Sequence, residues 1–265
     1  MRLSVIIITR DEAHRIDRAI KALRFADEIV VLDSGSTDGT VDLARAAGAR
    51  VEQTDDWPGF GRQKNRALDL AKGDWILSVD ADELVTQTLA GAIREAIARR
   101  DRDAESQAPV AWWIERRSRW CGRPVRFGDW RRDRVLRLFR RGSARFSDDV
   151  VHERVVCDGV QGKLAGWLWH DTVDTPEDGV EKALRYARLG AERLRKRGRG
   201  GRWSALWHAG GGFVRGYILR LGCLDGLAGW AIAATNAYAT WLRYRLAADP
   251  AFESKQTIPR RFTGR

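Results

Sequence analysis

The chain has 265 residues, of which 44% are hydrophobic, and a formal net charge of +11. That length and apolar content can bury a sizeable core, so disorder is not expected, and the basic excess favours an anionic partner. Cys121, Cys157 and Cys223 are widely separated without Cys-x-x-Cys spacing, which argues against a disulfide framework or a zinc site and favours a reducing cytoplasm.

The first residues predict a strand rather than a targeting segment. The apolar run Leu3–Thr9 is too short for a signal peptide, so export is not expected. Thr9, Arg10 and Glu12 lie at its end, where loops of α/β folds line ligand sites. We expect these three residues to line a base-binding pocket. Helix capping or surface solvation is the simpler interpretation of Glu12.

Strands and helices alternate over the first hundred residues. Strand-like runs are Leu3–Thr9, Glu28–Asp33, Arg50–Gln53 and Trp75–Val79, and helix-like segments lie near Ala13–Leu23, Val41–Ala47, Gln63–Ala71 and Thr86–Arg99. This alternation is typical of a parallel sheet with covering helices. The predicted fold class is therefore α/β, and these residues read as βαβαβαβα.

A small polar turn, Ser34–Thr40, follows the second predicted strand at Asp33. The carboxyl ends of parallel strands form the ligand-binding edge of open α/β sheets, and such a turn offers backbone N–H groups with little side-chain bulk. We expect Asp33 to accept from a base N–H or a ribose hydroxyl, with Ser34 in the same site. The alternative is an ordinary turn whose Ser and Asp cap the next helix.

Two carboxylates, Asp80 and Asp82, follow the fourth predicted strand. Mg²⁺ and Mn²⁺ prefer one or two carboxylates plus substrate phosphates. We predict that Asp82 holds a divalent metal, that Asp80 binds its water shell or a ribose hydroxyl, and that Ala81 lies in the donor site. The metal would neutralise a leaving nucleoside diphosphate. Lys64 is expected near the base or phosphates, unless it is merely solvated.

An arginine-rich stretch follows the polar segment Asp101–Pro109. Residues 112–145 contain 12 Arg and three acidic residues, interleaved with Trp and Phe. This composition fits a nucleic-acid face, a phosphate-binding acceptor wall or a solvated rim, and we favour the acceptor wall. A nucleic-acid partner is not expected, because no helix-turn-helix, zinc-finger or RNP pattern accompanies it.

The loop Phe146–Glu153 follows the predicted strand Val135–Arg140 and carries three carboxylates and an imidazole. Transfer to an acceptor hydroxyl needs a general base. The candidates are Glu153, Asp149 and Asp148, of which we choose Glu153, with His152 beside it as an orienting group. Ion pairing with one of the many arginines is the alternative role.

The C-terminal part predicts helices. Residues 182–198 are strongly basic, and the uncharged run Gly226–Leu242 is 17 residues long, short of the roughly 20 apolar residues of a spanning helix. This composition fits an interfacial helix pair that lies against anionic headgroups. It fits equally well helices that pack on the catalytic domain. The residues suited to the interface are Arg215, Tyr217, Arg220, Trp230, Tyr238, Trp241, Arg243 and Arg245. We predict a catalytic domain over 1–175 and a helical region over 176–265.

Three segments in order, Ser4–Glu12, Val31–Thr40 and Gly73–Glu83, carry a family resemblance. The chain resembles the inverting family 2 glycosyltransferases of the GT-A fold. The corresponding positions of that family bind the nucleotide and the divalent metal, which implies these roles for Asp33, Asp80 and Asp82. Asp11 departs from the pattern, since these enzymes often carry Asn there, and the base pocket is expected to differ accordingly.

A subgroup resemblance rests on Leu136–Arg140, Val151–Glu153 and Leu221–Gly226. These segments resemble lipopolysaccharide core glucosyltransferases, which implies transfer of glucose from a UDP donor to an inner-core heptose. It also implies an anionic lipid-linked acceptor and peripheral contact with the cytoplasmic face of the inner membrane. A polyprenyl-phosphate-linked glycan or a protein acceptor stays open. A nucleotidyltransferase would show a Gly-rich basic loop where this chain has Thr9–Glu12.

Overall fold

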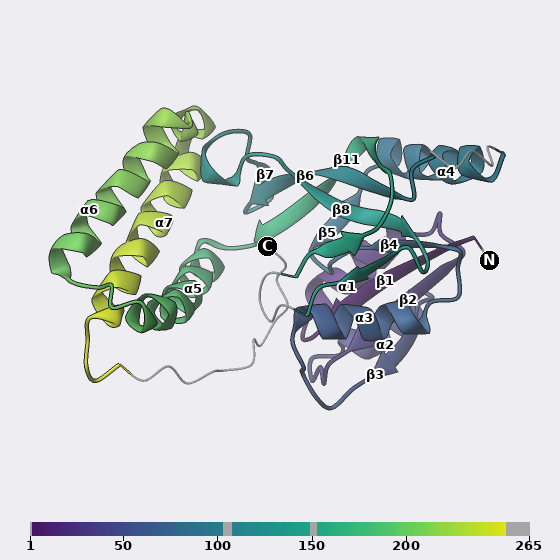
Figure 1. Cartoon of the computed structure of the whole chain (residues 1–265), viewed down its shortest axis with the longest axis horizontal. Coiled ribbons are helices and arrows are strands. Elements are labelled where there is room, and N and C mark those ends of the chain that lie inside the picture. Colours follow the sequence, from purple (N-terminus) through teal and green to yellow (C-terminus); the bar gives the residue numbers. More distant parts are fainter. Residues whose placement is uncertain (1, 103–107, 149–152, 253–265) are drawn as a thin grey trace. The chain divides into compact units, whose positions relative to one another are not determined.

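A computed structural model of the chain describes residues 2–102, 108–148 and 153–252. These residues form two compact units (Figure 1). The first contains residues up to 116 together with 133–170, and the second contains 117–132 together with the residues from 171 onward. The second unit thus combines two separate stretches of the sequence. The predicted domains, 1–175 and 176–265, stay a prediction.

The main sheet has the strand order β3-β2-β1-β4-β8-β6-β11-β5, with β7 paired to β6. Its strands are β1 (Leu3–Thr9), β2 (Glu28–Asp33), β3 (Arg50–Gln53), β4 (Trp75–Ser78), β5 (Glu83–Val85), β6 (Ala111–Trp120), β7 (Arg123–Pro124), β8 (Asp133–Arg140) and β11 (Gln161–Val173). The strands β3, β2, β1 and β4 pair in parallel, as predicted. Beyond β4 the sheet turns antiparallel, in the pairs β4–β8, β8–β6, β6–β7 and β11–β5.

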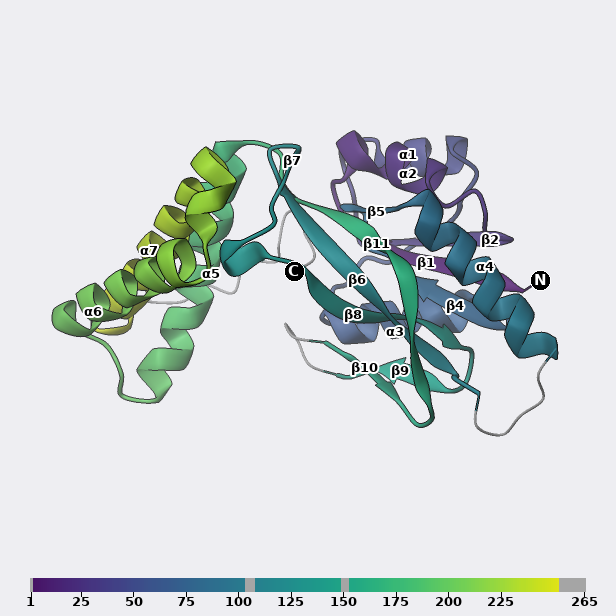
Figure 2. The same cartoon turned by 90° about the horizontal axis from the view of Figure 1, so that it is seen from above.

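Helices cover both faces of the parallel strands (Figure 2). They are α1 (Ala13–Lys21), α2 (Thr40–Ala46), α3 (Phe60–Leu70) and α4 (Gln87–Arg102). Leu3, Val5 and Ile7 of β1 belong to the hydrophobic cluster that includes residues of α1, α2 and α4, whereas Ile6 and Ile8 belong to a second cluster with residues of α3. Burial on both faces explains why β1 reads as a continuous apolar run.

The strand register brings the predicted site loops to one edge of the sheet. Thr9 of β1 pairs with Asp33 of β2, and Ile6 of β1 pairs with Ser78 of β4. Because β2, β1 and β4 are parallel neighbours, the loops that follow them leave the sheet side by side.

A small antiparallel hairpin carries the predicted catalytic loop. It consists of β9 (Ala144–Phe146) and β10 (Val155–Cys157), with Val155 paired to Phe146. At the neck of the loop the Ser147 backbone N–H donates to the Arg154 carbonyl over 2.9 Å. Asp149 and His152, two predicted catalytic residues, lie outside the described residues.

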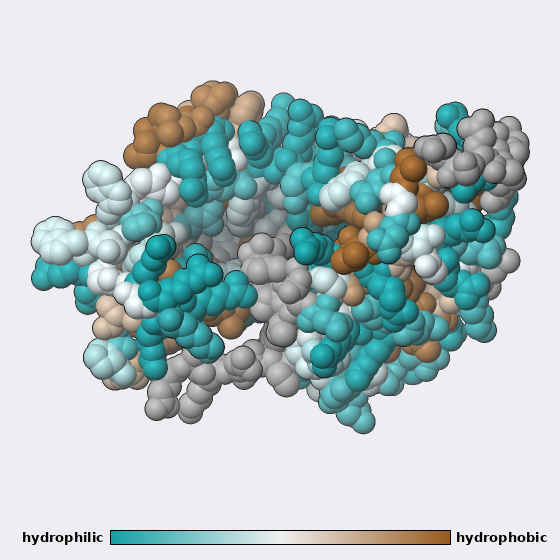
Figure 3. Space-filling view, viewed as in Figure 1, coloured by the Kyte–Doolittle hydropathy of each residue, from teal (hydrophilic) through white to brown (hydrophobic). Residues whose placement is uncertain are grey.

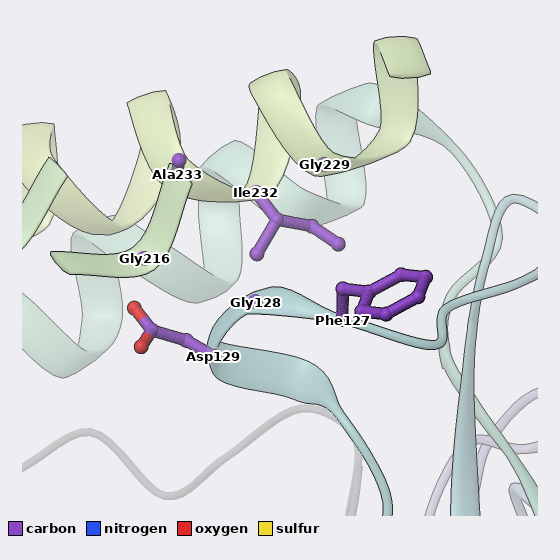
Figure 4. A pocket seen from close by; sticks show the side chains of 7 residues that line it. All are labelled: Phe127, Gly128, Asp129, Gly216, Gly229, Ile232 and Ala233. Carbon is purple, nitrogen blue, oxygen red and sulfur yellow. The ribbon is translucent and has the colours of Figure 1, made fainter. Parts of the chain in front are cut away.

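The second unit is mainly helical. It contains α5 (Pro176–Lys196), α6 (Arg202–Phe213) and α7 (Gly226–Ala247), and α7 packs against both other helices. Ala183, Ala187 and Ala239 form a small-residue cluster at the α5–α7 contact. The segment around Gly128 packs beneath α7, where Phe127 and Asp129 help to line a small pocket (Figure 4).

A tight turn joins α6 to α7. It consists of a π-helical segment, Val214–Leu219, and a 3₁₀ turn, Gly222–Asp225. Among the described residues no single helix is long and apolar enough to cross a membrane. The segments Arg202–Leu219 and Gly222–Ala247 are bent by 70° at this turn. Taken together, they have the length and the apolar composition of a broken membrane span.

Candidate active site

The loops after β1 and β2 are tied to each other by hydrogen bonds. The Asp11 backbone N–H donates to Ser36 Oγ over 2.8 Å, and Asp11 Oδ1 accepts from the Thr37 N–H over 2.8 Å. Asp11 has φ of 52°, a left-handed conformation in which Asn and Asp are enriched. An Asn at this position could adopt the same backbone and accept the same bond. The departure from the family pattern therefore changes charge more than geometry.

Asp33 closes its own turn. Its buried carboxylate accepts from the hydroxyl of Ser36 and from the backbone N–H groups of Gly35 and Ser36, over 3.1 and 2.9 Å. Helix α2 begins after Gly39 without a side-chain cap, so Asp33 stabilises the turn itself and does not cap the helix. Each carboxylate oxygen has two lone pairs, so a ligand contact would add to this role rather than replace it. Base or ribose recognition by Asp33 stays a prediction.

Other predicted donor-site residues lie around the same strand ends. Thr9 is fully buried, and its Oγ1 has no hydrogen-bond partner among the described residues. Ser34 Oγ accepts from Gln63 Nε2 of α3 over 2.9 Å. Glu12 is fully buried, which excludes surface solvation, and its Oε2 lies 4.0 Å from His14 Nε2. Arg10 is partly exposed and lies 3.9 Å from Asp11 Oδ2.

Asp80 is buried between two cations. Its Oδ1 lies 2.9 Å from Lys64 Nζ, and its Oδ2 accepts from Arg137 Nη2 over 2.5 Å. Burial alone would raise the pKa of Asp80, but the charges of Arg137 and Lys64 outweigh it and hold that pKa far below its usual range. In the structure Asp80 is therefore an ionised member of an ion cluster, and its metal or ribose contact stays a prediction.

Acid is expected to weaken the fold through Asp80. The folded-state pKa is depressed, so this carboxylate stabilises the fold above its unfolded-state pKa of about 3.9, and the stabilisation is lost as pH falls through the folded pKa. The unfolding free energy, measured by urea titration, should decline from about pH 5 downward. Asp80→Asn should show a shallower decline. Equal declines in both proteins would contradict the assignment of a depressed pKa to Asp80.

Glu83 holds the turn that presents Asp80. Its Oε2 accepts from the Asp80 backbone N–H over 3.0 Å, and its Oε1 accepts from Arg137 over 2.8 Å and from Arg116 over 3.3 Å. Arg116 and Arg137 are both buried, so these two of the twelve arginines belong to the protein interior and not to an acceptor wall. The sequence had suggested no role for Glu83, and it had grouped both arginines with the acceptor wall.

Ala81 contributes its methyl group to the hydrophobic cluster on the α1 side of the sheet. Its side chain is 2% exposed, so only its main chain is left for a donor contact.

Lys64 joins Asp80 to the predicted catalytic base. Its Nζ donates to Glu153 Oε1 over 2.8 Å while it contacts Asp80. Burial would lower the pKa of Lys64, but the negative charges of Asp80 and Glu153 outweigh it and raise that pKa. Lys64 is therefore a charged, buried bridge rather than a solvated surface lysine. Glu153 does form an ion pair, with a lysine rather than an arginine.

Helix α3 positions the hairpin that carries Glu153. Asn65 Nδ2 donates to the Phe146 carbonyl over 2.9 Å, and Asn65 Oδ1 accepts from the Phe146 N–H over 3.0 Å. A Cβ added at Gly61 would lie 1.8 Å from the Ser147 carbonyl oxygen and 3.4 Å from Glu153 Cβ. The glycine thus allows the catalytic loop to approach the helix backbone.

Gly61→Ala is expected to destabilise the fold by about 1–3 kcal/mol and to lower turnover, because Ser147 must move and Glu153 must move with it. The matched control is Gly91→Ala in α4, where an added Cβ meets nothing within 4 Å. That change should be neutral or stabilise by up to about 1 kcal/mol. Urea unfolding and steady-state rates measure both variants. Equal effects would contradict the close approach.

Asp82 lies beside a histidine that sequence reasoning missed. His170 Nε2 is 3.2 Å from Asp82 Oδ2, both side chains are buried, and Arg15 Nη1 lies 3.8 Å from the same oxygen. The register of β11 on β5 pairs His170 with Glu83, which places the imidazole at this turn. The long strand β11 was not predicted from the sequence, although the short apolar run Trp167–Trp169 could have indicated it.

The Asp82–His170 pair has donor atoms that fit a divalent cation. Neighbouring ligands of an octahedral ion, each about 2.1 Å from it, lie about 3 Å apart, close to the separation of these two atoms. Carboxylate oxygen and imidazole nitrogen both suit Mn²⁺-type ions. Within the described ranges no group of three or more His, Cys, Asp or Glu side chains could hold a metal. Phosphate and water oxygens would therefore have to complete the shell.

The strand-end loops of this site lie in a region that matches a known protein family. Residues 4–151, more than half of the chain, match the model of glycosyl transferase family 2. The chain belongs to that family. The matched region of this family 2 glycosyltransferase contains β1, β2 and β4 with their loops. Its parallel sheet with flanking helices, followed by a helical C-terminal unit, confirms the predicted GT-A fold class.

Relatives of this glycosyltransferase extend beyond the matched region. An uncharacterized glycosyltransferase of Rickettsia felis is 30% identical over 98% of this chain and 94% of its own length. Another, from Rickettsia bellii, is 35% identical, and the match spans 58% of this chain but only 52% of that protein. The lipopolysaccharide core biosynthesis glycosyltransferase LpsC of Rhizobium meliloti is 32% identical over 72% of this chain and 70% of its own.

Solved structures also match. The structure of S. aureus TarS 1–349 in complex with UDP-GlcNAc shows 25% identity and a TM-score of 0.39 over 45% of this chain and 35% of its own.

Proposed function

We propose that this glycosyltransferase moves a hexose, glucose, from a UDP-linked donor to a heptose of the lipopolysaccharide inner core with inversion. The observation that carries the proposal is the convergence of Asp80, Lys64 and Glu153 at the strand edge that bears the family motifs. The acceptor is supported by the likeness to LpsC, whose name assigns it to lipopolysaccharide core biosynthesis.

The donor would lie along the ends of β1, β2 and β4. Thr9 offers a buried hydroxyl, and Asp33 and Ser34 offer oxygens with remaining lone pairs. Arg10 and Glu12 bring opposite charges to the same loop. We assign base and ribose recognition to these residues, and a main-chain contact to Ala81. Lys64 is near enough to Asp80 to contribute positive charge beside the diphosphate.

Asp82 and His170 would hold the divalent metal, Mg²⁺ or Mn²⁺. When bound, the metal would neutralise the charge that develops on the leaving nucleoside diphosphate. Asp80 keeps its place beside this pair through Lys64, Arg137 and Glu83. The ionised state of Asp80 makes it an acceptor for water or ribose hydroxyls.

Glu153 would act as the general base. The acceptor oxygen bonds to the anomeric carbon as the bond to the diphosphate oxygen breaks, and the hydroxyl proton passes to the Glu153 carboxylate. Attack opposite the leaving group inverts the anomeric configuration. The ion pair with Lys64 holds the carboxylate in place. Asp149 stays the alternative candidate for the base, and His152 stays a proposed orienting group for the acceptor.

The acceptor would be an anionic, lipid-linked glycan. In the first unit Arg134, Arg140 and Arg141 are exposed, so these arginines are available for phosphate groups, unlike Arg116 and Arg137. Such an acceptor implies peripheral contact with the cytoplasmic face of the inner membrane, and we propose that location.

A donor and acceptor screen with the purified full chain tests the function. UDP-glucose, UDP-galactose, UDP-GlcNAc and GDP-mannose are supplied with Mg²⁺ or Mn²⁺ and heptose-terminated lipopolysaccharide. We expect UDP release from UDP-glucose and a β-linked product by NMR. In parallel assays, turnover only with polyprenyl phosphate or a peptide would show that the acceptor is not the heptose. Release of pyrophosphate from UTP and glucose 1-phosphate would indicate a nucleotidyltransferase instead.

A further inference from the structure

The turn between α6 and α7 exposes a group of aliphatic side chains that we call the apolar turn. Its members are between 44% and 72% exposed. They are Val214, Ile218, Leu219, Leu221, Leu224 and Leu227. Figure 3 shows hydrophobic colour gathered at the end of the helical unit where α6 and α7 meet. Single exposed leucines are ordinary, but a contiguous group of this kind marks an interaction surface.

The fold holds these side chains outward. Leu221 has φ of 59°, a conformation rarely adopted by a bulky residue. The Asp225 carboxylate accepts from the backbone N–H groups of Arg126 and Phe127, and these bonds tie the 3₁₀ turn to the segment that contains Arg126 and Phe127. A Cβ at Gly229 would lie 1.8 Å from the Gly222 carbonyl oxygen, so the start of α7 is pressed against the turn. The apolar turn is therefore a built, compact feature.

Cationic and aromatic side chains lie within and beside the apolar turn. Arg215 has a side chain that is 58% exposed, and Arg220, 40% exposed, donates to Asp129 over 2.6 Å. Trp230 is 52% exposed and follows Leu227 by three residues, on the same face of α7. Aliphatic side chains combined with Arg and Trp fit the boundary between acyl chains and anionic headgroups.

The depth of contact is limited by the same charges. Neither of the two segments joined at this turn is long and apolar enough for a membrane span by itself. Only the bent pair has that length and composition. Arg215 and Arg220 lie at their junction, and charged side chains at the bilayer centre are costly. Shallow contact keeps both guanidinium groups at phosphate depth and buries the aliphatic groups just below it.

We propose that the apolar turn inserts into the headgroup boundary of an anionic phospholipid bilayer. The proposal deepens the proposed function, since it names the surface by which the enzyme would reach a lipid-linked acceptor. It differs from the interfacial helix pair expected from the sequence, because Tyr217, Trp241 and Arg243 are only partly exposed. The contact is concentrated at the turn instead.

Vesicle flotation of the full chain tests the insertion. Wild-type protein should bind phosphatidylglycerol vesicles more tightly than phosphatidylcholine vesicles, and added salt should weaken the binding. Leu219→Ser with Leu224→Ser should weaken binding tenfold or more, because two aliphatic side chains lose their burial. The control is Leu43→Ser with Val160→Ser, two exposed aliphatic residues of the first unit, which should leave binding unchanged.

Cys223 allows the depth to be measured at the turn itself, since it is exposed between Leu221 and Leu224. With Cys121 and Cys157 replaced by Ser, an environment-sensitive fluorophore on Cys223 should shift to the blue on anionic vesicles. Nitroxide lipids labelled near the headgroup should quench it more than lipids labelled at the acyl end. Equal emission with and without vesicles would overturn the insertion.

Other outcomes also decide the proposal. Absence of wild-type binding to anionic vesicles would overturn it, as would equal loss in both double variants. A dimer in analytical ultracentrifugation that only the turn variant dissociates, without vesicle binding, would assign the surface to a second copy. UDP release from UDP-glucose with a lipid-free, heptose-terminated core oligosaccharide as acceptor is measured in parallel, without vesicles. Vesicle binding without any UDP release would reject the proposed function and leave the membrane contact standing.

Discussion

Asp82→Asn is expected to lower kcat for UDP-glucose turnover by about a thousandfold. The substitution keeps the size of the side chain but removes the charge that, with His170, would hold the metal. Loss of one group that stabilises the leaving charge costs roughly 10²–10³ in kcat, and loss of metal binding adds to this. UDP release at saturating donor and Mn²⁺ measures the rate.

Two further measurements separate metal binding from general damage. Mn²⁺ binding in the presence of UDP, followed by electron paramagnetic resonance, should weaken in Asp82→Asn and in His170→Ala. The control Asp42→Asn changes an exposed carboxylate in the first turn of α2 and should match wild type in both assays. Full turnover in Asp82→Asn would show that the reaction does not need this carboxylate.

Arg137→Met is expected to lower the free energy of unfolding by about 3–5 kcal/mol, because it leaves the buried carboxylates of Asp80 and Glu83 without their shared cation. Lys64 still pairs with Asp80, but Glu83 keeps only Arg116 over a longer 3.3 Å contact. Urea unfolding should show a lower midpoint with a similar slope, since the exposed area on unfolding changes little.

The same substitution at an exposed ion pair provides the control. Arg145 contacts Asp69 over 3.0 Å, and both side chains are 59% exposed. Solvent screens such pairs, so Arg145→Met should change the unfolding free energy by no more than about 1 kcal/mol. A similar loss in both variants would mean that burial of the Arg137 contacts does not matter as argued.

The parallel half of the sheet could be predicted from sequence because its signals are local. The predicted strands at β1, β2 and β3 coincide with the observed ones, and β4 ends at Ser78, one residue before its predicted end. Strands buried on both faces read as unbroken apolar runs whatever lies elsewhere in the chain. The adjacency of the motif loops then follows from parallel pairing, which the register confirms.

The interior of the site depends on partners that are distant in sequence. His170 lies 88 residues from Asp82, Glu153 lies 89 residues from Lys64, and Arg137 lies 57 residues from Asp80. No local pattern distinguishes Arg137 from the exposed arginines around it, because its burial comes from the pairing of β8 with β4. The insertion of residues 117–132 into the second unit is likewise a tertiary property.

Three consecutive residues at the start of α3 serve three different neighbours. Gln63 bonds the end of β2 through Ser34, Lys64 joins Asp80 to Glu153, and Asn65 holds the β9 strand. Successive helical residues point about 100° apart. The three contacts therefore depend on how the helix is rotated about its own axis. Deleting or adding a single residue just before Gln63 would turn all three side chains away from their partners at once. Length variation is therefore forbidden at this point of the chain.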